Sequence, residues 1–415
     1  MKRLFFGWII VIVGIFFSTY NSVLFVYGFT AFMTPITLSF GWNYAQVSLA
    51  SSLRGLETGS LDPLVGMAVD RWPARRLMAI GLLIYAGGVI FISQATNLAM
   101  FYGGFLIVGL GGAISITMVP STVIARWFKK NIGKASGLLS VGVALGGMFT
   151  PLIVKSIDSN GWENTLIYLA IGFLVMGMPL SFLFRSRPEE YGTLPDGQVI
   201  DEKTPVLETS SGMGVREAVK TKAFWAIGFS TMMQMMAIHA VTLHMMPYLE
   251  SLGMERADAA IPVTIFSVIT IICRILYGIL SDIFSKKRML AISMLMTSVG
   301  LLVFQSLDGS SFIMVVVFAV VYGIGAAGAM PLRTPIIREY FGVKRFGTIF
   351  GILALFLTVG TAGAAPLAGW VYDTRGEYYP IWLVFAGLSA IGVILILTME
   401  KSGDELRKRI DKENN

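Results

Sequence analysis

The sequence predicts an all-α membrane protein in which twelve transmembrane helices form two pseudo-symmetric six-helix bundles. Its composition supports this fold, because 55% of the 415 residues are hydrophobic and only 14% are charged, too few to cover a soluble domain. Apolar runs of roughly 20 residues, the length that spans a bilayer as a helix, recur along the chain. The two halves also share sequence landmarks, which indicates an internal duplication.

Apolar runs bounded by charged residues, prolines or glycines define the predicted spans. They cover residues 7–33, 43–68, 77–95, 99–125, 135–156, 164–184, 223–249, 258–281, 289–307, 311–337, 347–371 and 379–398. The first run continues to Met33 without a small-residue cleavage site, so we interpret it as a membrane helix and not as a signal peptide.

These spans predict four parts of the chain. We expect an N-terminal six-helix bundle over residues 1–184 and a C-terminal one over 223–400. The connection over 185–222 is polar and rich in prolines, and it is expected to be a mobile cytoplasmic loop. Residues 401–415 are expected to form a short cytoplasmic tail.

The 32 Lys and Arg residues predict the orientation of the chain. An even number of spans places both termini on one side, and we assign that side to the cytoplasm of a plasma or inner membrane because most basic residues then lie there. The exceptions are three residues on the opposite side and three within spans, namely Lys155, Arg256, Arg375, Arg54, Arg274 and Arg333. The net charge of +7 therefore follows from membrane topology and requires no nucleic-acid partner.

A pattern of glycine, aspartate and basic residues after the second span returns after the eighth. The copies lie 212 positions apart, as Gly278 against Gly66 shows. A glycine lets two helices approach closely, an aspartate can accept hydrogen bonds from a neighbouring helix N-terminus, and arginines favour lipid headgroups. The signature residues of the two copies are Gly66, Asp70, Arg71, Arg75, Arg76, Gly278 and Asp282. Glycines at helical spacing in the fifth span, including Gly142 and Gly146, likewise predict close packing.

The twelve spans, the central loop and the G-x-x-x-D-R-x-x-x-R-R signature together resemble the major facilitator superfamily over the whole chain. In that family, the aspartate and its basic neighbours brace the two halves on the cytoplasmic side. The resemblance therefore implies a gating role for Asp70 and the other signature residues. A role in membrane topology alone is the alternative.

Arg274 is the strongest candidate for a substrate-binding residue. An ionisable group in the hydrocarbon region is costly, so a charge inside a span is a functional candidate. Arg274 lies eight residues before Asp282, about 12 Å along a helix, which places it near the middle of the eighth span. Its guanidinium keeps its charge and can bind a carboxylate through two parallel hydrogen bonds. The alternative is a salt bridge with a neighbouring helix, although the seventh span between Lys222 and Glu250 contains no acidic residue.

The segment from Cys273 to Asp282 resembles the eighth helix of the monocarboxylate transporter and oxalate/formate antiporter branch, whose arginine binds the substrate carboxylate. The resemblance implies this role for Arg274. The chain departs from that branch at three places: Thr270 replaces an aspartate of the monocarboxylate carriers, and the first and eleventh spans lack a lysine. One arginine without a second cation favours a monoanion, and the departures leave the coupling ion open.

His239 and His244, the only two histidines, are candidate proton carriers and substrate contacts in the seventh span. An imidazole readily exchanges a proton near neutral pH. The two residues are five positions apart, about 140° around a helix, so both cannot face one cavity squarely. Pro247 follows closely and should bend the helix beside His244.

Other polar residues within spans are weaker candidates. Possible cavity residues, for which packing is the alternative, are Tyr20, Asn21, Tyr27 and Tyr322. Asp62 is either a proton site or a brace of the second span. Arg54 and Glu57 are three positions apart, and we interpret them as a locally neutralised pair.

The sequence contains no phosphate-binding loop, no metal-ligand spacing and no catalytic triad, so we expect neither an enzyme nor a cofactor or metal. We expect a monomeric secondary transporter that moves a small, monocarboxylate-like organic anion by alternating access. A proton or a counter-anion would be the coupling ion, and the lipid bilayer the surrounding partner. The alternative is an exporter of hydrophobic or cationic compounds, with Met and Phe side chains forming an adaptable cavity and Asp62 as its acidic residue.

Overall fold

The computed structural model describes residues 5–26, 28–42, 44–198, 212–308 and 311–400, and its regular elements there are all helical. The chain divides into two compact units. Unit 1 comprises Met1–Gly212 and Val343–Ile352, and unit 2 comprises Met213–Gly342 and Leu353–Asn415. The sequence also predicts a division between residues 184 and 223, but it does not anticipate that Val343–Ile352 joins unit 1. The tail predicted over 401–415 lies outside the described residues.

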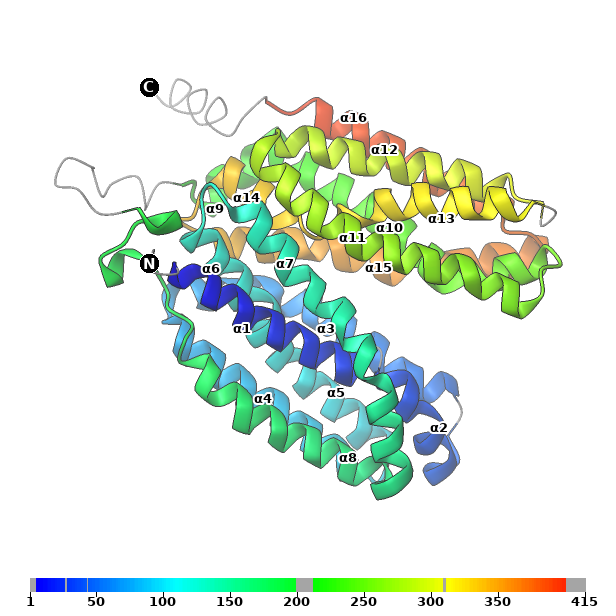
Figure 1. The fold of residues 1–415 in the computed structure, drawn as a ribbon, viewed down its shortest axis with the longest axis horizontal. Coiled ribbons are helices and arrows are strands. Elements are labelled where there is room, and N and C mark those ends of the chain that lie inside the picture. The colour runs from blue at the N-terminus through cyan, green and yellow to red at the C-terminus, as the bar shows by residue number, and fades with distance from the viewer. Residues whose placement is uncertain (1–4, 27, 43, 199–211, 309–310, 401–415) are drawn as a thin grey trace. The chain divides into compact units, whose positions relative to one another are not determined.

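Unit 1 contains the first six predicted spans, which run from blue to green in Figure 1. The first span consists of α1 (Phe6–Asn21), a π-helix η1 (Ser22–Val26) and α2 (Gly28–Phe40). The other elements of these six spans are α3 (Tyr44–Arg71), α4 (Ala74–Ser93), α5 (Leu98–Gly112), the π-helix η2 (Ala113–Met118), α6 (Val119–Trp127), α7 (Ile132–Leu145), the 3₁₀-helix η3 (Gly146–Phe149) and α8 (Thr150–Ser181). Two short 3₁₀-helices follow, η4 (Glu189–Tyr191) and η5 (Pro195–Gly197). Gly161 has a non-helical φ of 81° inside α8, in the gap predicted between the fifth and sixth spans.

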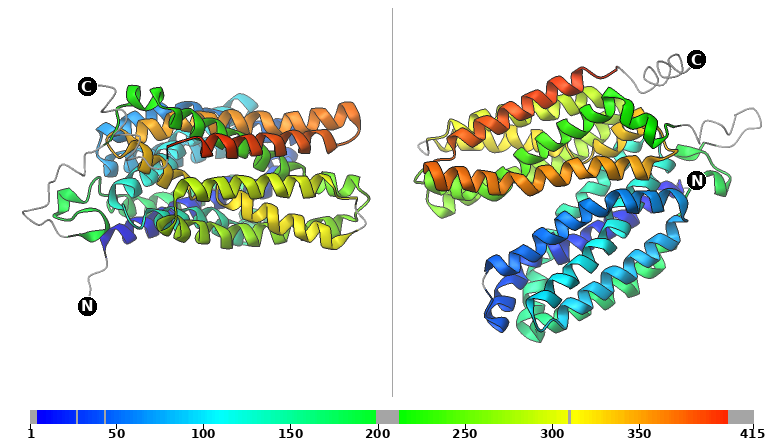
Figure 2. Two further views of the ribbon diagram at one scale, coloured as in Figure 1. Left: turned by 90° about the horizontal axis from the view of Figure 1, so that it is seen from above. Right: turned by 180° about the vertical axis from the view of Figure 1, so that it is seen from behind.

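Unit 2 contains most of the remaining helices. They are α9 (Val215–Lys220), α10 (Lys222–Ser251), α11 (Arg256–Ile283), α12 (Lys286–Gln305), α13 (Phe312–Ala327), α14 (Arg333–Phe341), α15 (Phe346–Arg375), whose first turns belong to unit 1, and α16 (Tyr379–Leu397). Within unit 2, α12 packs against both α13 and α16, and α10 packs against α16 (Figure 2).

Nine helices in the described part of the chain are long and apolar enough to cross a membrane. Other predicted spans correspond to shorter apolar helices, such as Phe312–Ala327, or to α3, whose interior carries charged side chains including Arg54 and Asp62. A 20-residue helix matches the thickness of a bilayer, so the apolar segments account for the architecture without a soluble core.

The first span packs tightly against the fifth through small residues. α1 contacts α7, and a Cβ on Gly142 would lie only 2.7 Å from the carbonyl oxygen of Ile15. One turn further, a Cβ on Gly146 would clash with Ser22, whose hydroxyl donates to the carbonyl oxygen of Val143 at 2.5 Å. The glycines of the fifth span therefore allow the close approach that their spacing predicts.

A buried polar network joins three helices of unit 2. Gln234 of α10 is 0% exposed, and its Nε2 donates to the hydroxyl of Ser293 in α12 at 2.9 Å. The Ser293 hydroxyl donates in turn to the carbonyl oxygen of Gly325 in α13 at 2.7 Å. A Cβ on Gly325 would clash with the Thr297 backbone, so the glycine permits this contact. The network satisfies Gln234 Nε2 and the Ser293 hydroxyl, which would be costly to bury alone, whereas the buried Gln234 Oε1 has no hydrogen bond with the described residues.

The segment after α8 folds onto unit 1 around Asp196. The Asp196 carboxylate accepts hydrogen bonds from the backbone N–H groups of Lys129, Lys130 and Asn131, at 2.8, 2.6 and 3.1 Å, and from the side-chain amide of Asn131 at 3.0 Å. Asp196 has a φ of 61°, which is uncommon for a residue other than glycine. Residues 185–198 are thus in contact with unit 1, 199–211 lie outside the described residues, and the mobility of the connection stays a prediction.

Candidate functional site

Asp70, at the end of α3, binds the N-terminus of α15. Its Oδ1 accepts a hydrogen bond from the N–H of Gly347 at 3.1 Å, and its Oδ2 accepts from the N–H and the hydroxyl of Thr348 at 3.0 and 2.8 Å. Arg126 of α6 forms an ion pair with Oδ1 at 3.3 Å. Because α15 begins at Phe346, the carboxylate meets the positive end of the helix dipole and satisfies N–H groups that have no partner within the helix.

Glycines bring α3 and the start of α15 into backbone contact. A Cβ on Gly66 would clash with the carbonyl of Gly347, and a Cβ on Gly351 would clash with the carbonyl of Asp62. Asp62 itself is only 5% exposed. This position suits a brace between the two helices, whereas the proton-binding role of Asp62 stays a prediction.

The basic residues of the first signature copy differ in their surroundings. Arg71 and Arg76 are exposed, while Arg75 donates from Nη2 to the hydroxyl of Tyr191 at 2.8 Å. The partner of Asp70 is instead Arg126, which sequence reasoning counted only as a cytoplasmic charge. Its position directly after the fourth predicted span is the one signal that could have drawn attention to it.

The second signature copy also joins helices at their ends. Gly278 is buried and Asp282 is half-buried at the end of α11. Just after them, Lys286 forms an ion pair with Glu339 of α14 at 3.0 Å. The ammonium of Lys287 donates to the carbonyl oxygens of Leu397 and Met399 at 3.1 and 2.5 Å, so it binds the C-terminal end of α16, where the helix dipole favours a cation.

Arg274 lies in the interior of α11 and is half-buried. Its Nε is buried, and so is the hydroxyl of Thr270 one turn earlier. On the same helix, Phe266 contacts the ring of Tyr322, with ring centroids 5.7 Å apart. Arg274 therefore lies eight residues after the residue of this aromatic contact, on a helix whose side chains are mostly not buried.

Tyr322 is a packing residue in this structure. It is 0% exposed and lies against Phe266 and Phe318, with ring centroids 5.7 and 5.4 Å away. Its hydroxyl is buried and forms no hydrogen bond with the part of the chain that the structure describes. The arrangement favours the packing alternative over a substrate contact.

The two histidines of α10 have different surroundings. His244 Nδ1 lies 3.1 Å from the hydroxyl of Tyr378, the residue before α16, and the two rings are tilted against each other. His239 is half-buried, and no hydrogen bond or ion pair joins it to another described residue. Of the two imidazoles, only that of His239 has no hydrogen bond or ion pair with the residues that the structure describes.

The polar residues of the first span belong to unit 1. The Tyr20 hydroxyl donates to the carbonyl oxygen of Leu169 at 2.7 Å, and its ring stacks on Phe173 at 4.5 Å. Asn21 Oδ1 lies 3.0 Å from the hydroxyl of Tyr85 and 3.5 Å from Arg54 Nη1. Tyr27 lies outside the described residues. The structure therefore brings Arg54 to Asn21, a contact that the sequence does not predict.

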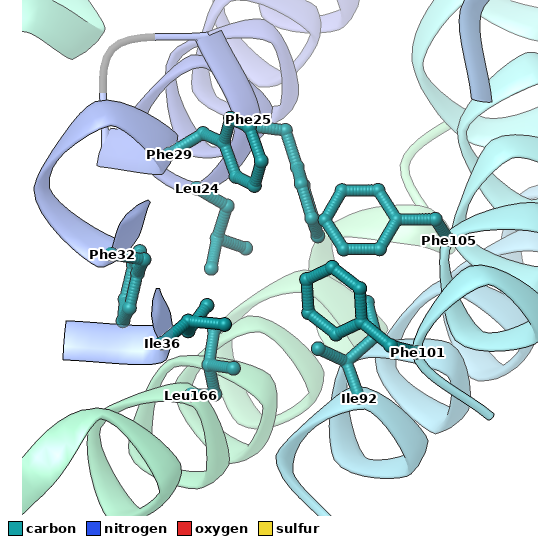
Figure 3. Close-up of a pocket in the computed structure, with 9 residues that line it drawn as sticks. All are labelled: Leu24, Phe25, Phe29, Phe32, Ile36, Ile92, Phe101, Phe105 and Leu166. Atoms are coloured by element: carbon teal, nitrogen blue, oxygen red, sulfur yellow. The ribbon is translucent and has the colours of Figure 1, made fainter. Parts of the chain in front are cut away.

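A small apolar pocket lies elsewhere in unit 1, beside η1 and α2 (Figure 3). Five phenylalanines and four aliphatic residues line it, namely Phe25, Phe29, Phe32, Phe101, Phe105, Leu24, Ile36, Ile92 and Leu166. Because no charged or polar side chain lines it, this pocket offers nothing that would hold a carboxylate.

The contact of Asp70 with α15 yields a first prediction. Asp70→Asn removes the charge and turns one acceptor atom into a donor, which should cost about 1.5–3 kcal/mol of local stability. Backbone amides in the first turn of α15 should then exchange with deuterium about tenfold faster or more. Hydrogen exchange read by mass spectrometry checks this, with Arg71→Gln on the exposed end of the same helix as control. Equal exchange in both variants would contradict the capping role.

Comparison with known proteins extends these observations. The sequence model of the Major Facilitator Superfamily matches residues 8–261 and 225–414. Monocarboxylate transporter 13 of Rattus norvegicus is 24% identical and covers 95% of this chain and 89% of its own length. The oxalate:formate antiporter of Oxalobacter formigenes is 22% identical and covers 83% of this chain and 82% of its own length. An agnestins efflux protein of Paecilomyces divaricatus is 23% identical and covers 94% of this chain and 86% of its own length.

A solved structure shows the same fold. The crystal structure of the human organic anion transporter MFSD10 superimposes with a TM-score of 0.71 at 13% identity, over 94% of this chain and 99% of that one. The solved structure and the family model confirm the predicted fold class, twelve membrane helices in two six-helix bundles. The family model also confirms the prediction of an integral membrane protein that is not an enzyme. The chain belongs to the major facilitator superfamily of membrane transporters.

Proposed function

We propose that this transporter moves a small organic anion, similar to a monocarboxylate, by alternating access, and that Arg274 binds the carboxylate. The observation that best supports this proposal is that Arg274, a half-buried charged residue, lies in the interior of a membrane helix. A charge placed there is costly and is retained where it has a function. Similarity to a monocarboxylate transporter and to an oxalate:formate antiporter supports this substrate class.

The chemistry of a guanidinium explains why this residue suits a carboxylate. Arginine stays protonated under all physiological conditions, and its planar fork forms two parallel hydrogen bonds with the two carboxylate oxygens. A lysine at the same position would keep the charge but lose the fork.

In this proposal, His239 is the proton carrier and the signature residues form the gate. The His244 imidazole already contacts Tyr378, whereas His239 has no such contact among the described residues. Asp70 contributes to the gate because it ties the end of α3 to the start of α15 through hydrogen bonds that can break and re-form. A proton or a counter-anion is the coupling ion, both termini face the cytoplasm, and the protein works as a monomer.

Substitution of Arg274 tests the proposal. Arg274→Ala and Arg274→Lys should each lower carboxylate uptake into proteoliposomes about 100-fold or more, since breaking a charged hydrogen-bonded pair costs at least about 2–5 kcal/mol. Arg288→Ala, at an exposed position of α12, is the matched control and should transport normally. Size-exclusion profiles should show that all three variants are folded. Normal uptake by Arg274→Lys would contradict the assignment of Arg274 as the residue that binds the carboxylate.

Substitution of the histidines separates their roles. His239→Gln should flatten the dependence of uptake on pH between about 5 and 8, the range in which an imidazole exchanges its proton. His244→Gln should keep that dependence, because its imidazole is held by Tyr378. Uptake is measured in proteoliposomes at fixed membrane potential. An unchanged pH profile in His239→Gln would exclude this residue as the proton carrier.

Export of hydrophobic compounds is a second candidate function. It is favoured by the pocket of Figure 3, which apolar side chains line entirely, and by similarity to an agnestins efflux protein. An export substrate without a carboxylate would not need the charge of Arg274. Efflux of a hydrophobic dye that persists in Arg274→Ala, combined with no carboxylate uptake in the unmodified protein, would favour this function.

A further inference from the structure

The segment that follows α8 binds the ends of several helices of unit 1. We call residues 185–198 the strap. Near its start, the Ser186 hydroxyl accepts a hydrogen bond at 2.9 Å from the N–H of Ala74, the first residue of α4, which has no partner within its own helix. Near its end, the Asp196 carboxylate accepts from the backbone N–H groups of residues 129–131, just before α7. The strap therefore ties the start of α4 to the loop between α6 and α7.

Aromatic contacts hold the first part of the strap against α1 and α6. The guanidinium carbon of Arg185 lies over the rings of Phe6 and Tyr191, 3.9 and 4.0 Å from their centres. Trp127, the last residue of α6, is 1% exposed, and its Nε1 donates to the carbonyl oxygen of Arg185 at 2.8 Å. A buried indole with its N–H hydrogen-bonded and a cation stacked on rings are held in specific geometries. The strap therefore also fixes the end of α6.

The end of α6 also carries Arg126, the ion-pair partner of Asp70. Arg126 directly precedes Trp127 and is 7% exposed. Its Nη2 lies 3.3 Å from Asp70 Oδ1 and 3.4 Å from the carbonyl oxygen of Val69. Two charged residues of the strap act on it as well: Glu190 favours its positive charge, and Arg187 opposes it. Arg126 thus contacts the end of α3 directly and is linked to the strap through its neighbour in the chain.

We infer that the strap controls the contact between Asp70 and α15, with Trp127 and Asp196 as positioning residues. By fixing the end of α6 and the loop after it, the strap keeps the Arg126 guanidinium beside the carboxylate that caps the start of α15. An ion pair contributes little unless its geometry is held, so release of the strap weakens the cap from a distance. The strap then sets how readily α3 and α15 separate during transport. The inference rests on the gating role of Asp70 in the proposed function.

Release of the strap at Asp196 tests this role in the full-length protein. Asp196→Gly removes the carboxylate, and glycine adopts the φ of 61° without strain. Amides of residues 129–131 and also of Gly347 and Thr348 should then exchange with deuterium about threefold faster or more, as read by mass spectrometry. Asp196→Asn keeps one acceptor oxygen and tolerates the same φ, so it should restore part of the protection. Gln198→Gly, at an exposed position of the strap, is the matched control and should change neither region.

A double variant shows whether the effect passes through Arg126. Arg126→Gln alone should speed exchange at the start of α15, and adding Asp196→Gly should speed it no further there. Trp127→Phe removes only the indole N–H and should reproduce the effect on α15, even if Asp196→Gly does not fold. Faster exchange confined to residues 129–131, or a full further increase in the double variant, would overturn the inference. Normal uptake by Asp70→Asn would instead contradict the gating role and leave the link between the strap and α15 standing.

Discussion

A charge inside a membrane span has to be matched by protein groups, water or a bound ligand, because hydrocarbon cannot solvate it. This constraint organises the molecule. At the helix ends the protein itself provides the match: Asp70 accepts three hydrogen bonds from the start of α15 and pairs with Arg126, and Lys287 donates to the last carbonyls of α16. Charges near the ends of spans therefore hold helices together, and charges in mid-span are the ones that can serve a substrate.

Two mid-span arginines are subject to the same constraint. Arg274 lies on a helix with few buried side chains, and Arg54 lies against an amide, an aromatic ring and the start of a π-helix. Both keep their charge, so neither can escape the cost of burial by losing a proton. In the proposed function, a small anion that enters from water binds Arg274, which would connect the costly placement of this side chain with transport.

Much of the architecture could be predicted from the sequence, because a bilayer turns hydrophobicity into helix length. The apolar runs predicted the positions of the spans. The gap between the fifth and sixth predicted spans also contains Gly161, where the backbone of α8 is not helical although α8 is assigned as one helix. The glycine and aspartate of the signature predicted a close helix contact and a helix N-terminus. The identity of that helix, α15, could not be predicted, because Asp70 and Thr348 are 278 positions apart and no periodicity links them. Asp196 was missed since its left-handed backbone depends on tertiary hydrogen bonds.

The candidate site was less predictable than the fold. The residue types inside the spans identified Arg274 and the histidines, but they could not show that His244 contacts Tyr378 or that Tyr322 is enclosed by phenylalanines. The pairing of Arg54 with Glu57, inferred from spacing along one helix, stays a prediction, while the contact of Arg54 with Asn21 depends on how α1 and α3 meet. Such contacts between helices are set by packing, which a single sequence does not encode in its local pattern.

The melting temperature of the purified transporter in the presence of candidate ligands tests the central claim most directly. A ligand that binds only the folded state at 100 times its dissociation constant adds about 2.7 kcal/mol of stability, enough for a clear rise. Small carboxylates such as lactate, pyruvate or formate should raise the melting temperature, and Arg274→Ala should abolish the rise. Stabilisation by hydrophobic cations and by none of the small carboxylates would contradict carboxylate binding at Arg274.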